Sequence, residues 1–145
     1  MSMSANREWI QSPFIFPENN TVYALTHMEY HNESNWMGLW SSVTSMRSTD
    51  AGLSWGHTLP PPRHIVAASP YMYKPTGPQS VLFGFRSPSN IIQSMDGSGF
   101  FYAFIMAGWA ANVDAAGQER GECLFRTRDV TEPSACTARH YPTGI

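Results

Sequence analysis

Apolar residues in this chain fall into short runs that alternate with polar residues and stop at turn-forming residues. Alternation with a period of two is typical of a half-buried strand, and no segment sustains the 3.6-residue period of an amphipathic helix. We therefore expect an all-β fold with little helix. The predicted strands span residues 21–29, 38–46, 65–69, 80–85, 91–95, 100–107 and 122–127.

Clusters of proline, glycine, serine and asparagine separate the predicted strands. The triple proline at 60–62 has no N–H to give to a sheet, so it indicates a connection between sheet units. A length of 145 residues fits one domain. We expect a single domain over 1–145 that ends in an irregular tail at 135–145.

The composition excludes several classes of partner. Only 14% of the residues are charged and the net charge is −2, so the chain lacks the basic surface that nucleic acid or an anionic membrane requires. No apolar run approaches the roughly 18 residues of a membrane span. No cofactor is predicted. The compartment is left open, with extracellular and periplasmic locations both compatible with the sequence.

The stretch from Ser48 to Trp55 gives the most specific local signal. Asp50 can accept backbone N–H groups within a tight turn, and Gly52 can adopt positive φ. Trp55 can fold back over the hairpin that the turn closes. These roles are structural, so Asp50 is not assigned as a catalytic acid.

This stretch matches S-x-D-x-G-x-x-W, the Asp-box of sialidases and other β-propellers, at Ser48, Asp50, Gly52 and Trp55. Three further stretches resemble glycoside-hydrolase propellers of the sialidase and arabinanase type. They are the opening run 9–27, the strand pair 87–104, and the hairpin 126–133, which is similar to R-x-x-D-L-x-x-P with Val130 in place of leucine.

The resemblance implies a propeller-like fold of repeated antiparallel sheets. Asp50 and Asp129 lie 79 positions apart, close to two blades of about 40 residues each. The chain then supplies about three blades, whereas closed propellers need at least four. We therefore expect an incomplete propeller, with exposed edge strands through which copies could associate.

His27, Glu29 and His31 alternate after an apolar run, so they share one face of a strand that reaches them. Three interpretations stay open: a polar strand end facing water, sugar contacts beside Trp36 and Trp40, and metal ligands. Alternate spacing on a strand is a weak metal signature, and no metal site is predicted here.

The resemblance implies hydrolysis of glycosidic bonds by paired carboxylates, with a carbohydrate as the ligand. The alternatives are a non-catalytic module that binds carbohydrate or protein, and an inactive truncated product. A sialidase would show an arginine cluster, so specificity for sialic acid is not supported. Glu29 and Glu119 are the expected catalytic residues; His27, His31, Trp36, Arg86 and Asn90 are the expected substrate-binding residues.

Overall fold

The computed structural model describes residues 7–16, 18–32, 35–69, 82–108, 121–133 and 137–141. These residues form ten strands and no α-helix, which confirms the expected all-β class. The strands are β1 (Arg7–Phe16), β2 (Thr21–Asn32), β3 (Asn35–Ser48), β4 (Gly56–His57), β5 (Ile65–Ala67), β6 (Leu82–Arg86), β7 (Ile92–Gln93), β8 (Phe101–Gly108), β9 (Gly121–Thr127) and β10 (Thr137–Tyr141).

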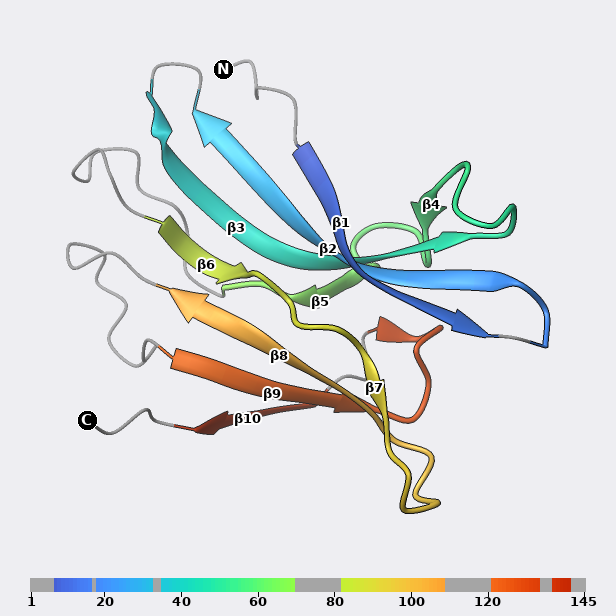
Figure 1. Ribbon diagram of the computed structural model, residues 1–145. Coiled ribbons are helices and arrows are strands. Elements are labelled where there is room, and N and C mark those ends of the chain that lie inside the picture. Colours follow the sequence, from blue (N-terminus) through green and yellow to red (C-terminus); the bar gives the residue numbers. More distant parts are fainter. Residues whose placement is uncertain are drawn as a thin grey trace.

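Two antiparallel meanders make up most of the fold (Figure 1). In the first, β1, β2, β3 and β4 pair in chain order, and in the second, β7, β8, β9 and β10 do the same. The meanders are joined through β3, whose second edge pairs with β4, β5 and β6 in turn. The β3–β6 pairing is parallel, and β6 continues antiparallel to β8. The result is a single mixed sheet, where separate antiparallel sheets were expected.

Two strands at the outer ends of the sheet were not among the predicted strands. Among the described strands β1 pairs with β2 alone, and most of its side chains are exposed, so its apolar pattern is weak. It also contains Pro13, which an edge strand tolerates because one of its sides needs no partner. β10 lies inside the tail that was expected to be irregular, and it pairs with β9. Both strands are held in the sheet by backbone hydrogen bonds. Such bonds leave little trace in the pattern of side chains, so the sequence did not predict these two strands.

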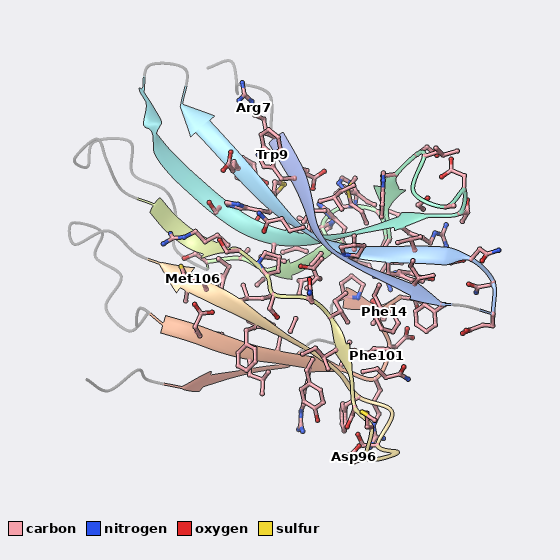
Figure 2. The ribbon with its side chains drawn as sticks, in the orientation of Figure 1. Arg7, Trp9, Phe14, Asp96, Phe101 and Met106 are labelled. Carbon is pink, nitrogen blue, oxygen red and sulfur yellow. The ribbon has the colours of Figure 1, made fainter. Side chains whose placement is uncertain are left out.

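The core lies between the two meanders. Val43 of β3 and Ile105 of β8 are fully buried, and they belong to one cluster with residues of β5 and β9. Aromatic rings extend the contact toward the first strand: the Phe14 and Phe101 rings meet edge to face with centroids 5.3 Å apart (Figure 2). The cluster comprises Val43, Ala67, Ile105, Ala107, Cys123 and Phe125.

The central strand β2 shows the alternation that its sequence predicts. One set of alternate side chains is almost completely buried, and the other set is buried or partly buried. Leu25, from the second set, packs against the core cluster. The first set is Val22, Ala24, Thr26 and Met28, and the second is Tyr23, Leu25, His27 and Glu29.

The turn between β3 and β4 is built around Asp50. Its carboxylate accepts the Ser54 N–H at 2.9 Å and the hydroxyl groups of Ser54 and Ser48 at 2.5 and 2.7 Å. Gly52 has a φ of 90°, and its carbonyl accepts the Trp55 indole N–H at 3.0 Å. Hydrogen bonding to Ser54 and Ser48 lowers the pKa of Asp50 to about 2. All of Asp50's contacts described here lie within the turn.

Similar turns occur in the second meander: one around Asp96 follows its first strand, and one around Asp129 follows its third strand. The Asp129 N–H donates to the Thr127 hydroxyl at 3.0 Å, and the Thr131 N–H donates to the Asp129 carboxylate at 2.8 Å. Asp50 and Asp129 thus mark the same position in consecutive meanders. The 79 residues between them span one repeat of the meander together with β5 and β6. The expectation was that this interval would hold two blades.

Candidate functional site

Trp9, His27 and Glu29 meet on one face of the first meander. Trp9 pairs with His27 across β1 and β2, and its indole Nε1 donates to Oε2 of Glu29 at 3.2 Å. Nδ1 of His27 lies 3.9 Å from Oε1 of Glu29. Trp9 is 52% exposed, so much of its ring remains open to solvent (Figure 2). The indole therefore orients the carboxylate and still presents an apolar surface.

His27 is buried at the base of this group. Burial lowers the pKa of its imidazole, the Glu29 carboxylate opposes that shift, and the Arg86 guanidinium adds to it. The lowered pKa favours a neutral ring, which has one donor and one acceptor nitrogen. Within the described part of the chain, its buried Nε2 has no hydrogen-bond partner.

Arg86, at the end of β6, brings a positive charge to the same region. Its guanidinium lies directly over Gly108 of β8, where an added Cβ would collide with Nη1. The sheet register explains the room available: Glu29 pairs with Ser41, Ser41 with Gly84, and Gly84 with Gly108. The positions in line with Glu29 on β3, β6 and β8 are therefore all small residues.

Of the residues predicted from sequence, the structure brings together His27, Glu29 and Arg86. Asn90 is an exposed residue between β6 and β7 and takes no part in these contacts. His31 and Trp36 lie in β2 and β3, but their side chains are outside the described part of the structure, and Glu119 is outside the described residues altogether.

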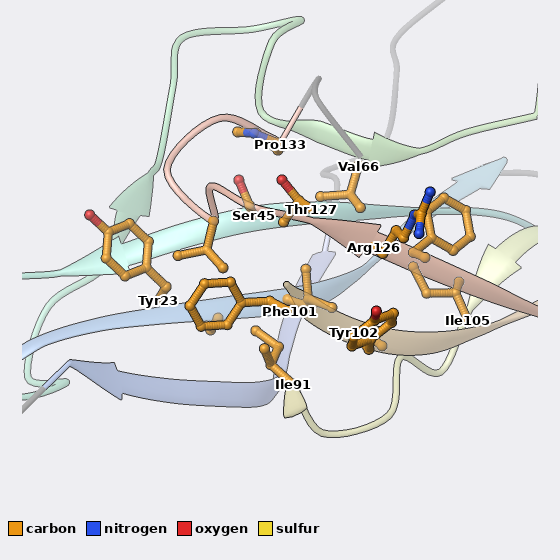
Figure 3. Close-up of a pocket in the computed structure, with 15 residues that line it drawn as sticks. Tyr23, Ser45, Val66, Ile91, Phe101, Tyr102, Ile105, Arg126, Thr127 and Pro133 are labelled. Carbon is orange, nitrogen blue, oxygen red and sulfur yellow. The ribbon is translucent and has the colours of Figure 1, made fainter. Parts of the chain in front are cut away.

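An apolar cavity of about 40 Å³ lies between the two meanders (Figure 3). It is lined by residues of both meanders, among them Tyr23 and Leu25 of β2, Phe101 of β8 and Phe125 of β9. Ligand pockets usually measure some 300–1,000 Å³. The cavity is therefore a packing space within the core, and the polar group around Glu29 is the stronger candidate site.

Glu8, His57 and His64 form a second polar cluster, which was not predicted from the sequence. Nε2 of His57 lies 3.0 Å from Oε2 of Glu8. The centroids of the His57 and His64 rings are 4.2 Å apart. Burial, followed by the neighbouring His57, lowers the pKa of His64. The three residues come from β1, β4 and the turn before β5, so no local spacing in the sequence signals their meeting.

The group around Glu29 combines an oriented carboxylate, an imidazole whose Nε2 has no partner among the described residues, a guanidinium and an exposed indole. Such a set can exchange hydrogen bonds with several hydroxyl groups while the indole covers an apolar surface of the ligand.

Comparison of the chain with protein-family models, curated proteins and solved structures gives no match. In the described part of the chain, no helix has the length and apolar character needed to cross a membrane.

Proposed function

We propose that this protein binds carbohydrate through Trp9, His27, Glu29 and Arg86. The observation that carries the proposal is the hydrogen bond from the Trp9 indole to Glu29, made by a ring that is 52% exposed. A sugar ring offers an apolar face of C–H groups and a rim of hydroxyl groups. An exposed aromatic ring beside a fixed acceptor suits both parts of such a ligand.

The charged groups set the polarity of the ligand. The Glu29 carboxylate accepts hydrogen bonds from sugar hydroxyl groups, and the Arg86 guanidinium donates to hydroxyl or carboxylate oxygens. His27 adds a buried nitrogen that makes no hydrogen bond to the described residues. A neutral or singly acidic sugar satisfies all three groups, whereas a strongly anionic polymer finds a single cation among them, the Arg86 guanidinium.

A propeller-like architecture is part of the proposal. It is supported by the two four-stranded antiparallel meanders and by the matching turns around Asp50 and Asp129 at the end of each third strand. The Trp9–Glu29 group then lies on the first two strands of a meander, and the Asp50 turn lies at the far end of its third strand, apart from the ligand.

Hydrolysis of glycosidic bonds is the second candidate function. It is favoured by the position of Glu29, whose side chain is only 17% exposed and is oriented by the Trp9 N–H. A glycosidase needs a second carboxylate across the scissile bond. Glu119 remains the proposed partner. Release of the aryl group from a panel of aryl glycosides tests this function separately from binding.

The binding proposal is tested by calorimetric titration of the wild type and Glu29→Gln with a panel of oligosaccharides. Loss of a charge-assisted hydrogen bond should weaken the affinity for the best ligand by about tenfold or more. Glu18→Gln, the same change in an exposed turn, is the matched control and should bind as the wild type does. Equal affinities of Glu29→Gln and wild type, or no binding by the wild type, would refute the proposal.

A further inference from the structure

The cluster of Glu8, His57 and His64 gathers one carboxylate and two imidazoles on the opposite side of β1 from Trp9. Glu8 and Trp9 are neighbours in a strand, so their side chains point to opposite faces. One ligand atom from each of the three residues lies within 4.8 Å of the other two. The imidazole planes of His57 and His64 are tilted by 36° and do not stack face to face.

Backbone hydrogen bonds hold both histidines against β3. His57 lies in β4, opposite Met46, and the N–H of the next residue, Thr58, donates to the Ser45 carbonyl at 3.1 Å. The His64 carbonyl accepts the Ser45 N–H at 2.9 Å. Both segments are therefore fastened to the same residue of β3, which fixes the two rings next to each other.

Buried hydroxyl groups orient the carboxylate. The Thr44 hydroxyl donates to Oε1 of Glu8 at 2.7 Å, and Thr26 shares a short hydrogen bond with Thr44. Both threonines are completely buried. Carboxylates that bind metal ions are commonly held in this way by a hydrogen bond to their other oxygen. Here Oε2 is the oxygen that faces His57.

His64 supplies an independent indication. It is only 6% exposed, and its buried Nδ1 has no hydrogen-bond partner in the described part of the chain. A buried polar atom without a partner is costly and calls for an explanation such as an ion. The side chains of His57 and Glu8 are 33% and 18% exposed, which leaves an approach from solvent.

We infer that Glu8, His57 and His64 bind a divalent transition-metal ion of the zinc type. Two imidazoles and a carboxylate suit such an ion and not calcium or magnesium, which take oxygen ligands. Ligands at about 2.0–2.2 Å from a tetrahedral zinc ion lie about 3.3 Å apart, so small side-chain movements close the site. Three protein ligands leave a position for water. The inference does not depend on carbohydrate binding.

The test is calorimetric titration of the full chain, free of any polyhistidine tag, with Zn²⁺, and with Co²⁺ monitored by its visible absorption. The wild type should bind one ion. Glu8→Gln and His57→Gln should each weaken the affinity by at least about tenfold. Glu18→Gln and His27→Gln are the matched controls, and both should retain the wild-type affinity, because neither residue belongs to the cluster.

Circular dichroism checks that each variant is folded; if His57→Gln does not fold, Glu8→Gln decides the outcome. The inference is overturned if the wild type shows no saturable binding of Zn²⁺, or if folded Glu8→Gln and His57→Gln bind as tightly as the wild type. It is also overturned if His27→Gln abolishes binding, because the ion then lies on the other face of the sheet, beside Glu29.

Discussion

Glu8 and Trp9, adjacent in β1, contact different clusters on opposite faces of the sheet. Oε2 of Glu8 lies 3.0 Å from Nε2 of His57, and Nε1 of Trp9 lies 3.2 Å from Oε2 of Glu29. One edge strand therefore contributes to both proposed sites. Because the alternation of a strand separates them by the thickness of the sheet, each site can be altered without touching the other.

Thr44→Val should weaken the proposed zinc site without removing a ligand. The change keeps the shape of a fully buried side chain and deletes the hydroxyl that orients Glu8. Loss of such a supporting hydrogen bond typically lowers metal affinity by about 10–100-fold. Titration with Zn²⁺ measures the effect. Thr58→Val is the control, since the Thr58 hydroxyl has no partner in the described part of the chain; equal losses in both variants would contradict the role given to Thr44.

Gly108→Ala should weaken carbohydrate binding by about tenfold by displacing the Arg86 guanidinium from its place over β8. The group that must move is the end of a flexible side chain, so we expect only a small change in melting temperature. Calorimetry with the best oligosaccharide measures the affinity. Gly56→Ala is the matched control, because a Cβ added there meets nothing within 4 Å. Unchanged affinity in Gly108→Ala would show that Arg86 does not contact the ligand.

Phe14 and Phe101 should couple the two meanders energetically. Phe101 is 7% exposed and contacts the rings of Phe14 and Phe16. Phe101→Ala should therefore lower the free energy of unfolding by about 3–5 kcal/mol. A double-mutant cycle with Phe14→Ala, measured by urea denaturation, should give a coupling of about 0.5–1.5 kcal/mol. Additive effects would mean that the edge-to-face contact contributes nothing beyond burial.

Asp50 should make the protein sensitive to acid. Hydrogen bonds from Ser54 and Ser48 lower its pKa from 3.8 to about 2 in the folded state. A lowered folded-state pKa means that the ionised carboxylate stabilises the fold above pH 3.8. This stabilisation is lost as the pH falls toward about 2, so the melting temperature should fall across this interval.

Ser54→Ala tests the cause of this shift. The variant should raise the pKa of Asp50 toward 3.8 and reduce the fall in melting temperature on acidification. Carboxyl carbon NMR titration measures the pKa directly. Asp96, whose pKa is lowered to about 2 by Ser94 and Ser98, is an internal control that should not move. An unchanged Asp50 pKa in Ser54→Ala would assign the shift to other groups.

Features that arise between near neighbours in the chain could be predicted from the amino-acid pattern alone. The alternation of β2 predicted which side chains share a face, and the turn around Asp50 closes through hydrogen bonds that span at most four residues. Such contacts depend on local residue types, so their pattern is visible in the chain. The meeting of His27 and Glu29 follows from the same alternation.

The way these elements combine depends on contacts between distant parts of the chain and became visible in the fold. The parallel pairing of β3 with β6 merged the meanders into one sheet, and it brought Arg86 toward His27. Glu8 and His57 lie 49 positions apart and meet because β4 folds back onto β3. The packing of the whole core decides which distant strands pair. The polar residues that meet as a result do not direct that pairing, so they carry no local signal of it. For that reason the sequence predicted the group at Glu29 in part and gave no sign of the cluster at Glu8.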